Sequence, residues 1–329
     1  MLYGHGDDSY KYGGIRMNFS SNVNCHADLA PLARHLSQRL ERALCVYPEP
    51  QPVSLECQLA AHLGIRADEV CVTAGATEAI YLIAQSLRGC VSAIAQPAFS
   101  EYADACRLHN HRLTVMGDPQ TEVCWLCNPA NPTGRVQDKA SVRELIDTHP
   151  QVTFVIDQSY EDFTLRPLLK AEEAVSMPNV ILLHSMTKRY ALPGLRLGYI
   201  TADSGLIRRI RAQRMPWSVN ALAIEAGLYI VSHPDPFCIE AYLSEARRLR
   251  DALRSIPGIE AGESDTHFML CRIAGRKASS LKEWLASEHG ILIRDASNFE
   301  GLDESHFRVA ARTPEEDDAL VEAIRCFVS

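Results

Sequence analysis

HSMTKRYALPGLRLGY, residues 184–199, places Lys188 behind a hydroxyl-rich tripeptide and Arg196 within an apolar run. The residues just before it, NVILLHS, are typical of a buried strand, and a Pro-Gly break separates the two cations. A lysine that deprotonates near neutral pH can form a Schiff base, and an arginine can bind a phosphate through two hydrogen bonds. A solvated surface lysine is the alternative, so the functional interpretation needs support from other parts of the chain.

Length and composition indicate a folded protein of about two domains. The chain has 329 residues, of which 47% are hydrophobic and 22% are charged. Its net charge of −8 gives no reason to expect general binding to nucleic acid or to an anionic membrane surface. Neither a signal peptide nor an apolar run of about 18 residues is visible, so we expect a cytoplasmic protein without membrane spans.

The eleven cysteines are scattered, and we expect reduced thiols rather than a disulfide framework. Cys124 and Cys127 form a C-x-x-C pair, but the Asn-Pro step that follows does not open a helix. No second ligand pair stands at zinc-binding spacing. We therefore predict a core pair on a strand and no metal site.

The order of apolar runs predicts an α/β fold. Between residues 69 and 201, short β-rich runs recur with helical stretches between several of them, which is typical of a largely parallel sheet covered on both faces. Helical patterns dominate afterwards, and a smaller α+β unit closes the chain. We predict a large domain at 47–233, a small α+β domain at 234–329, and an N-terminal segment at 1–46 that joins the small domain.

Three further polar motifs lie where strands are expected to end. TAGATE (73–78) could hold an anion at a strand-to-helix turn, although a plain turn is the alternative. NPANPTG would present Asn131 in a rigid loop, or would be a structural turn only. VIDQSY ends with Asp157 and Tyr160, where a buried carboxylate could bind a metal, an arginine or a protonated ring nitrogen, or could cap a helix. Parallel strand ends meet at one edge of a sheet, so these motifs predict a shared site.

The asparagine loop, the D-x-x-Y strand end, the S-x-T-K segment and the arginine follow one another in the order of a known family. Together they resemble the pyridoxal-phosphate enzymes of class I and II aminotransferases. The resemblance covers most of the chain. It implies the aspartate aminotransferase fold, with a mostly parallel seven-stranded sheet in the large domain, and pyridoxal 5'-phosphate as cofactor.

The resemblance also implies roles for individual residues. Lys188, Asp157 and Tyr160 would be catalytic: Lys188 would bond to the cofactor's aldehyde carbon, and Asp157 would keep the pyridine nitrogen protonated. Tyr160 and Asn131 would bind the ring hydroxyl. The remaining cofactor contacts would be the phosphate-binding Ala76, Thr77, Ser185 and Arg196, the ring-stacking Phe99, and Tyr47 from the second subunit of a homodimer. A core Phe99 and an extended linker at Tyr47 are the alternatives.

Within the family, NFSSNVN (18–24) and ILIRDASNFEGLDESHFRVAAR (291–312) are similar to threonine-phosphate decarboxylases of cobalamin biosynthesis, whose near relatives are the histidinol-phosphate aminotransferases. This likeness implies a phosphorylated amino-acid substrate. The implied substrate-binding residues are His5, Asn22 and Arg294 at the phosphate, Arg312 at the carboxylate, and Asn131. A flexible terminal histidine, a turn-forming asparagine and surface arginines are the alternatives.

Two departures from the decarboxylase pattern stand near these residues. The usual early H-G-G-N is HGDDSY here, and position 74 is alanine rather than a polar residue. The bond that breaks at the substrate Cα depends on how the carboxylate and phosphate are anchored. Decarboxylation of L-threonine O-3-phosphate is therefore the first hypothesis, transamination of histidinol phosphate the second, and a non-catalytic binding protein the third.

Overall fold

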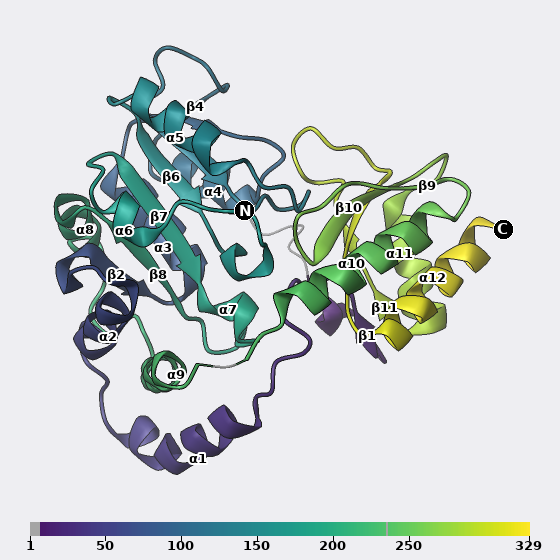
Figure 1. Ribbon diagram of the computed structural model, residues 1–329, viewed down its shortest axis with the longest axis horizontal. Coiled ribbons are helices and arrows are strands. Elements are labelled where there is room, and N and C mark those ends of the chain that lie inside the picture. Colours follow the sequence, from purple (N-terminus) through teal and green to yellow (C-terminus); the bar gives the residue numbers. More distant parts are fainter. Residues whose placement is uncertain (1–6, 235) are drawn as a thin grey trace.

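The large domain is built on one seven-stranded sheet. We describe residues 7–234 and 236–329 of a computed structural model, shown in Figure 1. The strand order is β2-β8-β7-β6-β5-β3-β4, and β8 alone runs antiparallel to its neighbours. The strands are β2 (Val70–Thr73), β3 (Val91–Ile94), β4 (Arg112–Thr114), β5 (Val123–Cys127), β6 (Thr153–Asp157), β7 (Val180–Ser185) and β8 (Gly198–Ala202).

Both faces of this sheet are buried, which explains why its central strands read as continuous apolar runs. Val155 and Ile181 pack under α3, α4 and α8 on one face, while Phe154 and Leu182 pack toward α5 and α6 on the other. The covering helices are α3 (Gly75–Ser86), α4 (Ser100–Leu108), α5 (Lys139–Thr148), α6 (Ala171–Ala174) and α8 (Ser204–Arg211). β4 and β5 are joined without a helix at the edge of the sheet.

Four further helices complete this part: α1 (Ala30–Cys45), α2 (Val53–Leu63), the short α7 (Met186–Arg189) and α9 (Ala221–Ser232). α1 lies away from the sheet at the lower edge of Figure 1 and contacts α9. Only Leu32 of α1 is buried in the single chain. Short 3-10 turns occupy Ser9–Lys11, Ala67–Glu69 and Glu161–Phe163.

The small domain, on the right in Figure 1, packs helices against an antiparallel sheet in the order β12-β13-β10-β9. Its strands are β9 (Ile259–Ala261), β10 (Phe268–Ile273), β12 (Arg294–Asp295) and β13 (His306–Ala310). Its helices are α10 (Ile239–Arg254), α11 (Ala278–His289) and α12 (Pro314–Val328). β1 (Met17–Asn18) comes from the N-terminal segment and pairs in parallel with β11 (Ile291–Leu292).

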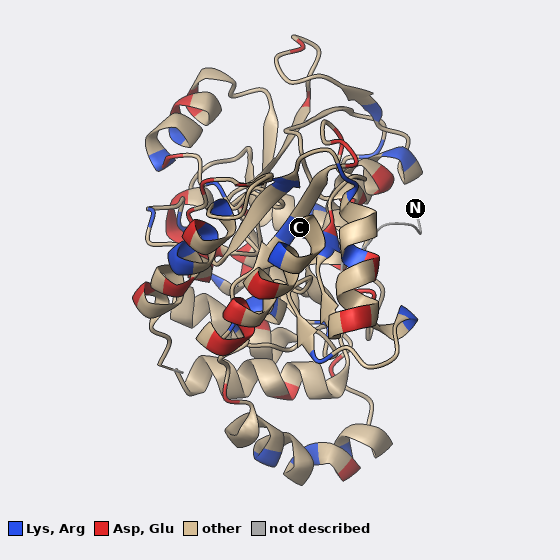
Figure 2. Cartoon of the chain, turned by 90° about the vertical axis from the view of Figure 1, so that its right-hand side faces the viewer, with Lys and Arg blue, Asp and Glu red and all other residues tan. Residues whose placement is uncertain are grey.

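The predicted fold class is confirmed: a mostly parallel seven-stranded sheet is accompanied by a smaller α+β unit. Acidic and basic residues are intermingled over the face seen in Figure 2. Across residues 7–234 and 236–329, no helix has both the length and the apolar character that a membrane crossing requires.

Candidate active site

A cavity of about 230 Å³ opens where the carboxyl ends of the large-domain strands meet the small domain. Most of the residues predicted from separate motifs line it together. The predicted residues in its wall are Asn22, Ala76, Thr77, Phe99, Asn131, Asp157, Tyr160, Ser185, Lys188, Arg196 and Arg294. The site predicted at the strand ends is therefore assembled from both domains and from the N-terminal segment.

Lys188 projects into this cavity from α7, immediately after β7. Burial of the amine, together with the positive charges of Arg308 and Arg196, lowers its pKa to about 8. A substantial fraction of the amine is thus neutral near physiological pH, as a nucleophilic lysine requires. The alternative of a fully solvated surface lysine does not fit this position.

Asp157 is the last residue of β6, between Cys127 of β5 and Leu183 of β7. Its carboxylate accepts hydrogen bonds from the Tyr102 hydroxyl (2.6 Å) and the Ser159 backbone N–H (2.8 Å). Both donors are neutral, and burial raises the pKa of the carboxyl group. A cation placed against it would offset the cost of burying the charge.

An anion cradle lies at the N-terminus of α3. Ala76 and Thr77 line the cavity at this helix end, opposite Ser185 and Arg196. Gly75 has φ +85°, and a Cβ there would lie 2.8 Å from Nη2 of Arg196. The absence of a side chain therefore lets the guanidinium approach backbone N–H groups that favour negative charge through the helix dipole. Such a pocket suits a phosphate.

Asn131, Tyr160 and Asn22 form the far wall. Asn22 donates from Nδ2 to the Tyr160 hydroxyl (3.3 Å), and burial raises the pKa of Tyr160 to about 12. The Oδ1 atom of Asn131 accepts from Nη1 of Arg308 (2.5 Å). Phe99, at the start of α4, also lines the cavity and contacts Tyr102 edge-on with ring centroids 6.0 Å apart.

The structure places Arg308 in the cavity and Arg312 outside it. The Arg312 guanidinium is bound by Glu316 (Nε–Oε2 2.9 Å) and by the Asn18 carbonyl (3.1 Å). Arg308 is 5% exposed, lies within β13 and donates from Nη2 to the Ser20 carbonyl (2.7 Å). Arg312, predicted to bind the substrate carboxylate, does not line the cavity, because β13 ends at Ala310 and the chain has left the site by position 312.

Other predictions have different outcomes. His5 lies outside the described residues. Tyr47 is 85% exposed and does not line the cavity; its ring lies near Trp217, with centroids 5.7 Å apart. Asp7, which the sequence did not single out as a site residue, does line the cavity. Its position in the departure HGDDSY, next to a predicted substrate histidine, is the signal that could have identified it.

The C-x-x-C pair lies on β5, as predicted. Cys124 is buried in the core, and the Cys127 thiol donates to the Pro129 carbonyl (3.2 Å). Burial raises the pKa of each thiol to about 12, so neither is a ready thiolate. Within the described ranges, no group of three or more histidine, cysteine or acidic side chains is arranged to hold a metal ion.

Known proteins share this arrangement over nearly the whole chain. The sequence model of the family "Aminotransferase class I and II" matches residues 15–324. A threonine-phosphate decarboxylase from Salmonella typhimurium is 30% identical over 336 residues, covering 94% of this chain and 90% of that protein. A histidinol-phosphate aminotransferase from Thermoanaerobacter is 28% identical over 301 residues, covering 85% and 84%.

Among solved structures, L-threonine-O-3-phosphate decarboxylase from Porphyromonas gingivalis superposes with a TM-score of 0.93 at 37% identity, covering 95% of this chain and 99% of that one. The cofactor of the family, pyridoxal 5'-phosphate, fits the residues present. The described hydrogen-bond donors to the buried Asp157, Tyr102 and Ser159, are neutral, and a protonated pyridine nitrogen would supply a cation, while the cradle around Gly75 suits the phosphate. The chain therefore belongs to the class I and II aminotransferases, a family of pyridoxal-phosphate-dependent enzymes.

Proposed function

We propose that this enzyme decarboxylates L-threonine O-3-phosphate to (R)-1-amino-2-propanol O-2-phosphate in cobalamin biosynthesis. One observation carries the proposal: Arg294 and Arg308 stand directly opposite each other on β12 and β13, and both line the cavity. They are 6% and 5% exposed. Like charges opposite each other across a strand pair destabilise a sheet, and burial adds to this cost. A ligand with two anionic groups would offset both the repulsion between the two arginines and the cost of burying them.

The ionisation of the two arginines supports an anion-binding role. Burial and the positive charge of Arg308 together lower the pKa of Arg294 to about 10, and burial lowers the pKa of Arg308. Arg294 therefore stays protonated at neutral pH. The buried Nε of Arg308 has no hydrogen-bond partner among residues 7–234 and 236–329. The proposal gives Arg308 the substrate carboxylate, and gives Arg294 and Asn22 the substrate phosphate, with His5 as a further phosphate ligand.

Pyridoxal phosphate, when bound, supplies an electron sink for negative charge that develops at the substrate Cα. In this proposal Asp157 holds a positive charge on the ring nitrogen, and Tyr160 and Asn131 orient the ring hydroxyl. Ala76, Thr77, Ser185 and Arg196 hold the cofactor phosphate. Lys188 would hold the cofactor at its aldehyde carbon and would carry a proton to or from the substrate carbon.

Which bond breaks would depend on the two substrate anchors. If Arg308 orients the bond between Cα and the carboxylate carbon for cleavage, that bond would break and CO2 would leave. If the anchors instead orient the Cα–H bond for cleavage, Lys188 would take the proton, as transamination requires. Arg294 and Arg308 would thus select substrates by the distance between the carboxylate and the phosphate.

Transamination of histidinol phosphate is the second candidate, favoured by the 28% identity to a histidinol-phosphate aminotransferase over 85% of the chain. Histidinol phosphate carries a phosphate but no carboxylate, so it would occupy only one of the two arginines. The second substrate, 2-oxoglutarate, would occupy both. The 37% identity to the P. gingivalis decarboxylase structure favours the first candidate.

A direct assay separates the two. The purified protein with pyridoxal phosphate is given L-threonine O-3-phosphate alone, and CO2 and aminopropanol phosphate are measured. In parallel it is given histidinol phosphate and 2-oxoglutarate, and glutamate is measured. We expect products in the first reaction only; glutamate without CO2 release would overturn the proposal.

We also propose a homodimer. Tyr47 follows α1, and exposed apolar side chains surround it, including Leu44 and Val46 on the same segment and Trp217 beside its ring. Contact with a second copy would bury this face and would bring Tyr47 toward the partner's cofactor phosphate. Analytical ultracentrifugation of the wild type and of Tyr47→Ala tests the assembly, and the affinity of each protein for pyridoxal phosphate tests the phosphate contact. We expect both proteins to be dimers and the variant to bind pyridoxal phosphate more weakly.

A further inference from the structure

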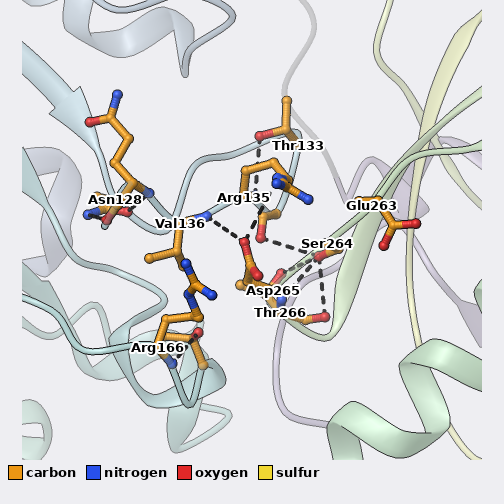
Figure 3. A network of polar contacts seen from close by, with 12 residues as sticks. Asn128, Thr133, Arg135, Val136, Arg166, Glu263, Ser264, Asp265 and Thr266 are labelled. Atoms are coloured by element: carbon orange, nitrogen blue, oxygen red, sulfur yellow. Dashed lines mark hydrogen bonds and ion pairs between the residues drawn. The ribbon is translucent and has the colours of Figure 1, made fainter. Parts of the chain in front are cut away.

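A small-domain loop contacts the loop at residues 128–136, which carries Asn131 and is named the Asn131 loop here. Figure 3 shows Asp265 of the small-domain loop beside Val136. The loop between β9 and β10 carries Ser264, Asp265 and Thr266. Asp265 donates its backbone N–H to the Gly134 carbonyl (2.8 Å), and its carboxylate accepts from the Val136 N–H (2.9 Å). We name these two bonds the Asp265 clasp. The clasp joins residues more than 125 positions apart and connects the two domains.

The close approach of the two loops is built into the Asn131 loop itself. Gly134 has φ +72°, and a Cβ there would overlap the Ser264 hydroxyl and lie 2.5 Å from the Phe268 carbonyl oxygen. Ser264 adds a weak hydrogen bond from Oγ to the Gly134 carbonyl (3.3 Å). The Arg135 guanidinium lies 3.9 Å from the Asp265 carboxylate, so the charge there is partly balanced. A glycine is therefore required where the small domain contacts the loop.

Gly134, which accepts one bond of the clasp, stands three residues after Asn131, whose side chain lines the cavity. Within the loop, the Gly134 N–H donates to the Ala130 carbonyl (2.7 Å), and the Ala130 N–H donates to the Arg135 carbonyl (2.8 Å). These bonds make the segment on either side of Asn131 one rigid unit. Asn131 Oδ1 is held at its tip by Arg308. Small-domain residues thus hold Asn131 at its Oδ1 atom and hold the loop that carries it at Gly134 and Val136.

We propose that Asp265 is a positioning residue, which sets where Asn131 presents its Nδ2 donors to the ring of pyridoxal phosphate. Asp265 does not line the cavity, so it acts through the loop and not on substrate. The inference rests on the proposed role of Asn131 at the cofactor ring. It is independent of which bond at the substrate Cα breaks, and therefore of the choice between decarboxylation and transamination.

The chain offers a matched control. Glu263, two residues before Asp265, forms ion pairs with Arg250 (2.7 Å) and Arg254 (2.8 Å) inside the small domain. Toward the Asn131 loop its carboxylate has an electrostatic attraction to Arg135 but, among the described residues, no hydrogen bond. Asp265→Ala and Glu263→Ala each remove one carboxylate from the same loop. Asp265→Asn keeps an oxygen that can accept from Val136 N–H, and serves as the conservative rescue.

The test measures the cofactor rather than the turnover of substrate. For each variant, the dissociation constant of pyridoxal phosphate and the pH midpoint of the visible absorbance of the Lys188-bound cofactor are determined, together with the thermal midpoint. For Asp265→Ala we expect about threefold to tenfold weaker cofactor binding, the loss of one typical hydrogen bond, and a shifted absorbance midpoint. For Asp265→Asn both should return toward wild type, and for Glu263→Ala neither should change even if the thermal midpoint falls.

If Asp265→Ala lowers only the thermal midpoint and leaves both cofactor measurements at the wild-type values, Asp265 merely joins the domains and the proposal is overturned. If Asp265→Ala does not fold, Ser264→Ala is measured instead, because it removes the hydroxyl bond to Gly134 together with the hydroxyl bonds to Thr266 and Phe268 inside the small domain, and it keeps both bonds of the clasp. A smaller shift in the same direction is then expected, and no shift contradicts the proposal. Wild-type protein that binds the cofactor normally but releases no CO2 would refute the proposed function and leave this test intact.

Discussion

Single substitutions of Arg308 and Arg312 by glutamine test which of the two arginines binds the substrate carboxylate. Arg308→Gln removes a buried guanidinium from the cavity, whereas Arg312→Gln removes one that pairs with Glu316 at the edge of α12. Truncating one partner of a buried, hydrogen-bonded charge pair costs about 2–5 kcal/mol. At about 1.4 kcal/mol for each factor of ten, Arg308→Gln should lower kcat/KM for threonine phosphate by about 30-fold to 5000-fold.

The Arg312 variant should behave differently. Its ion pair with Glu316 is partly exposed, with side chains 22% and 23% accessible, and exposed ion pairs contribute about 0.2–1 kcal/mol. We expect kcat/KM to stay within about threefold of wild type. CO2 release at several concentrations of L-threonine O-3-phosphate measures both variants, and thermal melting checks that both are folded. A loss above about 100-fold in Arg312→Gln, with Arg308→Gln near wild type, would refute the assignment drawn from the structure.

Three further predictions concern the cofactor site. Borohydride reduction should attach pyridoxal phosphate covalently to the Lys188 peptide of the wild type, and mass spectrometry should find no such label in Lys188→Ala; a label of equal yield elsewhere would contradict the assignment. Asp157→Asn should weaken pyridoxal phosphate binding by about 30-fold or more, since a buried charge partner is lost, and equilibrium dialysis that finds less than a threefold change would count against the ring-nitrogen role. Arg196→Gln removes one of the positive charges that lower the Lys188 pKa of about 8, so the pKa should rise, the neutral amine fraction at pH 7 should fall, and trapping of phosphate-free pyridoxal by borohydride should become slower at that pH.

The large-domain half of the site could be predicted because its signals are local. Each motif combines a buried strand with a polar residue at its end, and parallel strands bring those ends to one edge of the sheet. Lys188, Asp157 and Asn131 therefore meet in the cavity, as their separate motifs predicted. The pattern also predicted that the C-x-x-C pair belongs to a strand. These inferences required no knowledge of how distant segments pair.

The small-domain half depends on pairing that the sequence does not show. Arg308 and Arg312 stand four residues apart in one run, and only the end of β13 decides which of them faces the cavity. The hydroxyl partner of Asp157 is Tyr102 from α4, and no local pattern connects residues separated by 55 positions. Asp7 reaches the cavity because Asp8 is anchored by Lys282 through two bonds of 2.8 and 2.7 Å. Contacts of this kind appear only in three dimensions.

The pairing of β1 with β11 affects the order in which parts of the chain can fold during synthesis. Met17 lies beside Ile291, so the N-terminal strand has no partner until nearly the whole polypeptide has left the ribosome. The large sheet closes over residues 70–202 and can form earlier. Ser20, which follows β1 and lines the cavity, accepts a hydrogen bond from Arg308, a residue that is synthesised later still. The large sheet could thus fold first and the active site could be completed last. A chain released before residue 291 would lack Arg294 and Arg308, which line the cavity.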